Sequence, residues 1–174
     1  MGAATAQGQA GTGGSVSWAN AEGGVTFNLA DSITSTTTPI AIPTATGTNF
    51  SWLKNLVIAV TVTGTTSFTN RTIKMSTTTS TGLAMWYKAV AVASYAQAAS
   101  GNRPTASGSN GATPAGYTSM TTSAVQYDNT SVASSGSGPN GSMAVCVIGV
   151  DNLYVGGAGT AIALPSIVLS YDEA

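Results

Sequence analysis

The chain has 174 residues, of which 6% are charged and none is histidine, and its net charge is −1. Ordinary soluble domains carry about a quarter charged residues, and the five Lys and Arg residues here are too scattered to form a nucleic-acid-binding patch. With no histidine and a single cysteine, Cys146, the sequence excludes imidazole-based catalysis, an intrachain disulfide and thiolate metal sites. Such a composition is typical of a protein that sits in an assembly or on an outer surface.

The first segment, residues 1–24, is rich in Gly, Ala, Gln, Ser and Thr and holds one large apolar residue, Trp18. Such a stretch buries too little apolar area to offset the entropy lost when it orders. We expect an extended N-terminal arm that is either unordered or ordered by a neighbouring subunit. Trp18 would anchor it there, because tryptophan is favoured at interfaces. Residues 25–174 are expected to form a single β-sandwich domain.

Alternation of apolar and polar residues predicts the first strands of that domain. Strands are expected at residues 25–29, 52–63 and 68–78, and a proline-bracketed edge strand at residues 39–43. Residues 83–95 are rich in alanine, which favours a helix, but their valines and aromatic residues favour a strand.

The second half of the chain alternates between loops and strands. Residues 96–116 and 134–141 read as loops, and residues 117–132 contain a polar strand around residues 120–127. Residues 143–150 are almost all apolar, which predicts a strand covered on both faces, and residues 162–171 supply a closing strand. About eight short strands without a convincing helix predict an all-β fold, a jelly-roll-like β-sandwich.

The sequence offers little for catalysis or metal binding. Two facing carboxylates could serve a glycosidase, but the six Asp and Glu residues are better explained as turns, caps and solvated ends. Asp128 and Asp151, each followed by Asn, could offer oxygen ligands to calcium, yet the spaced carboxylates of a calcium loop are missing. We therefore expect no catalytic residue, no cofactor and no metal site.

Aromatic residues are the remaining candidates for contact with a partner. Trp52 and Trp86 lie in strong predicted strands, which favours core filling or subunit contact. Tyr117 and Tyr127 lie in polar surroundings beside the long loop, which favours contact with something outside the domain. Together with Trp18 they are the predicted partner-binding residues.

Three short stretches carry a family resemblance. Val25-Thr-Phe-Asn-Leu-Ala-Asp31, then Pro39-Ile-Ala-Ile-Pro43, then Gly47-Thr-Asn-Phe-Ser-Trp52 resemble small β-rich structural proteins of tailed bacteriophages that decorate or cement capsids. The resemblance extends over residues 25–95. It implies a place on the capsid exterior of a virion, no catalysis, binding to the major capsid protein and self-association, frequently as homotrimers.

The leading hypothesis is therefore a capsid decoration (cement) protein that binds and stabilises a phage head, with no nucleic-acid partner. No secretory signal peptide and no membrane-spanning run are visible, so we expect no membrane partner. The alternative is a tail- or fibre-associated adhesion module that binds a host-surface glycan through its long loops and tyrosines. A pilus or surface-layer subunit is a third reading, which would need another secretion route.

Overall fold

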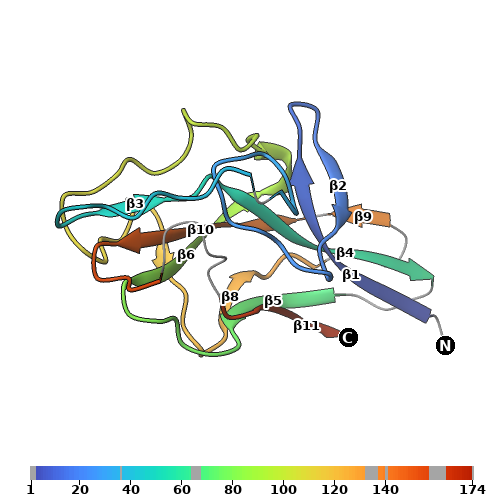
Figure 1. Cartoon of the computed structure of the whole chain (residues 1–174). Coiled ribbons are helices and arrows are strands. Elements are labelled where there is room, and N and C mark those ends of the chain that lie inside the picture. Colours follow the sequence, from blue (N-terminus) through green and yellow to red (C-terminus); the bar gives the residue numbers. More distant parts are fainter. Residues whose placement is uncertain are drawn as a thin grey trace.

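A computed structural model of the chain describes residues 3–35, 37–63, 68–131, 137–139, 141–156 and 164–173. Within these residues the fold is all-β, as predicted, and its single helical element is a 3-10 turn, η1 (Val92–Ser94) (Figure 1). The strands are β1 (Ala3–Thr12), β2 (Ser17–Asn20), β3 (Thr48–Phe50), β4 (Lys54–Thr63), β5 (Phe68–Met75), β6 (Leu83–Ala91), β7 (Thr118–Ser119), β8 (Val125–Asp128), β9 (Ser137–Pro139), β10 (Ser142–Asp151) and β11 (Ile167–Glu173).

The strands form two antiparallel sheets that pack face to face. The larger sheet has eight strands in the order β2-β1-β4-β10-β6-β7, with β3 also paired to β10 and β9 also paired to β4. The smaller sheet has the order β11-β5-β8 and lies below the larger one in Figure 1. One shared apolar cluster joins them, so the predicted sandwich is confirmed. The division into eight and three strands is less even than the division of eight strands over the two sheets of a jelly roll.

β10 lies at the centre of the molecule. Ala144, Cys146 and Ile148 face the smaller sheet, whereas Val145 and Val147 belong to a second apolar cluster on the opposite face. The predicted strand with two covered faces is thus confirmed. Burial raises the pKa of the Cys146 thiol far above its ordinary value, because the thiolate would have no solvation there.

The N-terminal segment differs from the expected arm. β1 pairs with β4 of the same chain over nine register positions, from Ala3 opposite Thr63 to Gly11 opposite Asn55, and β2 folds back on β1. Figure 1 shows this hairpin at one end of the larger sheet. The physical reason is that ladder hydrogen bonds need no large side chains. Composition reflects only how much surface the side chains can bury, and in β1 even a side chain as small as that of Ala10 is buried.

Removing residues 1–20 is expected to lower the melting temperature by about 10 °C, which corresponds to about 3 kcal/mol in a domain of this size. The deletion leaves the outer edge of β4 unpaired and uncovers Ile58, which is buried in the whole chain. Differential scanning calorimetry measures the effect, and a chain that begins at Ala3 is the control. An unchanged melting temperature would mean that β1 does not stabilise its own subunit.

Two predicted strands are loops that still face the core. In residues 25–29, Phe27 is buried and Val25 and Leu29 pack against the core, as the alternation indicated. The backbone, however, bonds to neighbouring loop residues: the Leu29 amide donates to the Thr38 carbonyl at 2.8 Å. Residues 39–43 likewise form no strand. Alternation reports which side chains face inward, not whether a partner strand lies alongside.

The remaining predicted elements occur with shorter or shifted bounds. The strand predicted at residues 83–95 ends at Ala91 and continues into η1, and residues 96–116 form the predicted long loop. The segment 117–132, in which a polar strand was predicted around residues 120–127, contains the two short strands β7 and β8. The predicted loop at residues 134–141 contains β9, and its other residues apart from Gly141 lie outside the described ones.

A buried lysine fastens one loop to the larger sheet. The Nζ of Lys54, at the start of β4, donates to the carbonyl oxygens of Ala30 at 2.8 Å and Ser32 at 2.7 Å, and to Oδ1 of Asn28 at 3.2 Å. Burial lowers the pKa of Lys54 to about 8, although the nearby Asp31 carboxylate opposes that shift. The Lys54 ammonium therefore lies inside the protein, where it donates hydrogen bonds to three oxygen atoms.

Candidate functional site: a groove between the two sheets

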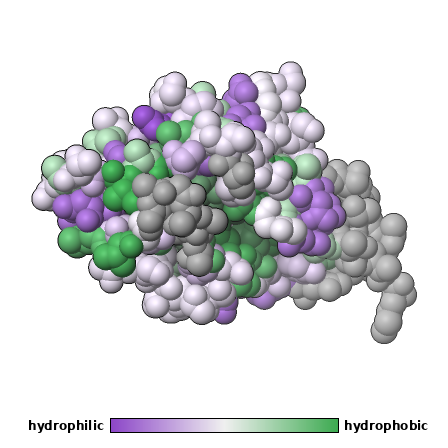
Figure 2. All heavy atoms as spheres, in the orientation of Figure 1, coloured by the Kyte–Doolittle hydropathy of each residue, from purple (hydrophilic) through white to green (hydrophobic). Residues whose placement is uncertain are grey.

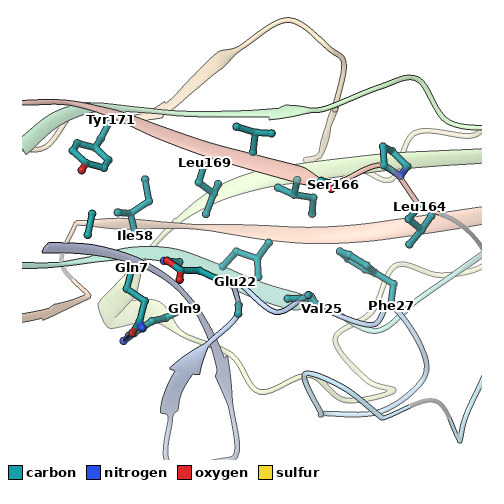
Figure 3. A pocket seen from close by; sticks show the side chains of 18 residues that line it. Gln7, Gln9, Glu22, Val25, Phe27, Ile58, Leu164, Ser166, Leu169 and Tyr171 are labelled. Atoms are coloured by element: carbon teal, nitrogen blue, oxygen red, sulfur yellow. Dashed lines mark hydrogen bonds between the residues drawn. The ribbon is translucent and has the colours of Figure 1, made fainter.

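A groove of about 610 Å³ lies between the two sheets, where β11 faces β1 and β4 (Figure 3). It follows from the unequal widths of the sheets. β11 is the outer strand of the smaller sheet, whereas the larger sheet continues from β4 to β1 and β2. The small side chains of β1 at Ala6 and Gly8 line the resulting hollow. The groove therefore occupies the place that one further strand of the smaller sheet would fill.

The walls of the groove are apolar. Tyr171, Leu169 and Leu164 line it from the side of β11, and Ile58 and Phe27 lie across from them (Figure 3). Apolar residues also gather in a hollow near the middle of the face shown in Figure 2. Such walls suit apolar side chains of a partner, since burying them gains about 25 cal/mol per Å² of apolar surface.

Polar side chains also line the groove, among them Gln7, Gln9 and Glu22. The backbone amide of Gly8 donates to the Glu22 carboxylate at 3.3 Å, and Nε2 of Gln9 donates to Oε1 of Gln7 at 3.0 Å. Glu22 is the single carboxylate of the lining, which contains no basic residue. Acid–base chemistry uses a positioned pair of proton-transfer groups, and the described lining holds no pair of carboxylates.

The strand beside the groove has an open edge. Among the described residues β11 pairs with β5 alone, and its ladder shifts register between Ser170 and Asp172. An outer strand presents unpaired N–H and C=O groups that can bind an extended segment of another chain. Apolar walls beside such an edge provide both parts of a strand-addition site, namely main-chain hydrogen bonds and pockets for alternate side chains.

Trp18, the predicted anchor of the arm, packs within its own chain. Its ring meets that of Tyr95 edge to face, with 5.9 Å between ring centroids, and lies over Gly11. A Cβ at Gly11 would be 2.9 Å from the Trp18 ring, so this close approach requires glycine. The Tyr95 hydroxyl donates to the Gly13 carbonyl at 3.0 Å. Trp18 thus holds the N-terminal hairpin against η1 and the segment after it.

The two predicted contact tyrosines lie on opposite faces of the larger sheet. Tyr127 is 6% exposed and belongs to the core between the sheets, so the prediction that it contacts an outside partner is wrong. The pairing of β8 with β5 shifts register between Gln126 and Asp128, and Tyr127 is buried whereas Val125 is 37% exposed. Tyr117 is half-buried against the other cluster, which also includes Trp18. The structure therefore does not bring the three predicted residues into one site.

A buried ion pair was not foreseen from the sequence. Arg71 of β5 donates to the Asp128 carboxylate of β8, and both side chains are almost fully buried. The same carboxylate accepts the backbone amides of Ser142 at 2.8 Å and Thr130 at 2.9 Å. Burial alone would raise the pKa of Asp128, but these hydrogen bonds and the guanidinium hold it below its ordinary value. The pair joins neighbouring strands of the smaller sheet, and the hydrogen bond from Ser142 connects the Asp128 carboxylate to β10 of the larger sheet.

Glycine is required next to this pair. Gly141 has a φ of +75°, and a Cβ there would overlap the Asp128 carboxylate and the Arg71 guanidinium. Asp151 is the other residue that could have offered an oxygen ligand to calcium. Its carboxylate instead accepts a hydrogen bond from the Leu153 amide at 2.9 Å in a turn, as expected.

Metal sites, membrane spans and known relatives were also sought. Within the described ranges, no three His, Cys, Asp or Glu side chains gather closely enough to hold a metal ion. The same residues contain no helix with the length and apolar character that a membrane crossing requires. The chain matches no protein-family model, no curated protein and no solved structure.

Proposed function

We propose that this chain is a non-enzymatic structural protein of a virion, a capsid decoration protein that binds the exterior of a phage head and stabilises it. The resemblance of residues 25–95 to such proteins suggested this role. The structural observation that supports it best is the apolar groove beside the open edge of β11. An apolar groove and an open strand edge are both features of a protein that binds a partner.

The distribution of charge also favours a role in an assembly. Four of the eleven charged residues are buried, namely Lys54, Arg71, Asp128 and Asp151. The surface therefore carries few charges of either sign, and such surfaces promote association. A surface with few charges helps a protein that stays bound in a particle, whereas it makes a freely diffusing protein prone to aggregation.

The occupant of the groove in this proposal is an extended, uncharged segment of the major capsid protein. Such a segment would pair with the open edge of β11 and insert alternate apolar side chains between Leu169 and Phe27. The lining offers no basic residue to an acidic segment, and Glu22 is its one site for a basic partner. Self-association as a homotrimer would multiply the attachments and raise the overall avidity.

A cryo-electron microscopy map of whole particles that contain this chain tests the proposal. Density for the fold over the capsid lattice, at three-fold or quasi-three-fold positions, is the expected result. Density confined to the tail tip would overturn it and favour the adhesion reading. The same map would show whether a capsid-protein segment lies against β11.

Replacing Val25 with lysine is expected to reduce binding to heads that lack the protein by about tenfold or more, because placing a charge against the apolar side chains of the bound segment costs over 1.4 kcal/mol. Val25 lines the groove, whereas Val155 is 96% exposed outside it. Val155→Lys is the matched control, since it introduces the same charge elsewhere. Sedimentation of protein with particles measures binding, and thermal unfolding verifies that both variants fold. Equal binding by both would remove the groove from the attachment mechanism.

A further inference from the structure

A second hollow, about 530 Å³ in volume, lies in the long loop that follows η1. Its walls come from residues 102–107 and 112–115 of the loop, from Tyr117, from Lys88 of β6 and from Phe50 of β3. Phe50 and Tyr117 belong to the apolar cluster on the face of the larger sheet that is turned away from the smaller sheet. This loop cleft is therefore separate from the groove beside β11.

The loop cleft concentrates positive charge. Lys54 and Arg71 are buried, which leaves three basic residues nearer the surface, and two of these, Lys88 and Arg103, line the cleft. No Asp or Glu lines it. Among the described residues neither Lys88 nor Arg103 takes part in an ion pair. In a chain of net charge −1, two cations without carboxylate partners in one concavity favour an anionic ligand.

The other groups in the cleft suit a sugar. The Lys88 ammonium lies 4.8 Å from the centroid of the Tyr117 ring, so the cation and the aromatic surface are adjacent. Asn102, Thr105 and Ser107 add amide and hydroxyl groups to the walls. Aromatic rings pack against the C–H faces of sugars, and side chains with both donors and acceptors match sugar hydroxyls.

The cleft is held in shape by bonds to the sheet. Thr48 of β3 and Ser107 exchange two backbone hydrogen bonds, at 2.9 and 3.0 Å, and the Thr48 hydroxyl donates to the Ser109 carbonyl at 2.8 Å. On the other wall, the indole N–H of Trp86 donates to the Thr113 hydroxyl at 3.2 Å. A loop fixed at both walls loses little entropy on binding, which is the condition for a preformed ligand site.

We propose that the loop cleft binds an acidic saccharide, a sugar that carries a carboxylate. Lys88 and Arg103 bind the carboxylate, and Tyr117 with the neighbouring hydroxyl and amide groups contacts the sugar ring. This site goes beyond attachment to a shell and does not depend on it, because it uses different residues on the opposite face of the larger sheet.

Isothermal titration calorimetry of the full chain with a galacturonic acid trisaccharide tests the proposal. The methyl ester of the same trisaccharide is the matched ligand, since it differs only in lacking the negative charges. We expect binding of the acid, at least tenfold weaker binding of the ester, and weaker binding of the acid as salt is raised. Lys88→Gln and Arg103→Gln are each expected to weaken binding about tenfold. Lys74→Gln, which removes the third surface cation outside the cleft, is expected to have no effect.

Several results would overturn this inference. No binding, or equal affinity for acid and ester, would exclude recognition of the carboxylate. Equal weakening by Lys74→Gln would indicate attraction by overall charge. Inorganic phosphate that binds as tightly as the trisaccharide would indicate an anion site without a sugar contact. Because Arg103 is exposed, Arg103→Gln keeps the test valid even where Lys88→Gln alters the fold.

Discussion

Replacing Asp128 with asparagine is expected to lower the free energy of unfolding by about 3–5 kcal/mol, the usual cost of removing one partner of a buried ion pair. The variant removes the carboxylate that the Arg71 guanidinium, which is 1% exposed, binds in the folded protein. It also weakens the acceptor of the Ser142 amide at the start of β10. Urea denaturation followed by circular dichroism measures the loss.

A surface carboxylate provides the control for this prediction. Asp172 accepts a hydrogen bond from Asn70 but is exposed, so Asp172→Asn is expected to cost less than about 1 kcal/mol. The double variant Arg71→Met with Asp128→Leu is expected to recover part of the stability, because neither charge of this pair then remains buried. The recovery should be incomplete, since the amides of Ser142 and Thr130 still lose their acceptor. A cost below 1 kcal/mol for Asp128→Asn would contradict the assigned role.

The same pair predicts how stability depends on pH. The pKa of Asp128 is lower in the folded protein than its ordinary value of 3.8. Between the two values the unfolded chain binds more protons, so this stabilisation is complete above about pH 4 and is lost as the pH falls through the folded-state pKa. The Asp128→Asn variant should lack this component of the acid dependence, which urea denaturation at pH 2–6 would measure.

Replacing Trp86 with alanine is expected to cost about 3–5 kcal/mol, the range for large aromatic side chains in a core. Trp86 is 1% exposed and meets Phe50 edge to face, with 5.6 Å between ring centroids. Gly149 on β10 makes room for its ring, because a Cβ there would lie 2.7 Å away. The substitution also removes the donor to Thr113, so the long loop loses one of its attachments.

Trp18→Ala is the matched control for Trp86→Ala. Trp18 is half-buried and packs on Tyr95, so its removal is expected to cost about 1–2 kcal/mol. Chemical denaturation gives both values. Amide hydrogen exchange should in addition rise in residues 102–117 of the Trp86 variant and not of the Trp18 variant. Equal costs for the two substitutions would contradict the packing described for Trp86.

The strands that carry large apolar residues could be predicted from the sequence. β10 was found because its residues are apolar almost without interruption, and β4 and β5 because Leu56, Ile58 and Ile73 alternate with other residues. β1 could not be found this way, since its stability comes from pairing with β4 rather than from its own side chains. Local patterns report burial, whereas strand pairing depends on segments far apart in the chain.

The candidate sites were harder to predict for the same reason. The groove arises from a three-stranded sheet packed on a wider one, which no short motif encodes. Arg71 and Asp128 are separated by 57 residues, so their charges could not be paired from the sequence. Tyr117 was correctly placed beside the long loop, where it lines the cleft. Tyr127 was misplaced because polar neighbours suggested exposure, whereas both the Tyr127 ring and the neighbouring Asp128 are buried.

The central position of β10 determines when the protein can fold. β10 pairs with β3, β4 and β6, all of which are made earlier, and Gly149 lies opposite Phe50. Until residue 151 has left the ribosome, a growing chain therefore contains β3, β4 and β6 without the strand that pairs with all three. Pairings of such long sequence separation form slowly and keep apolar surface exposed meanwhile. We expect the larger sheet to form only after β10 has been made, with a chaperone needed most before that point.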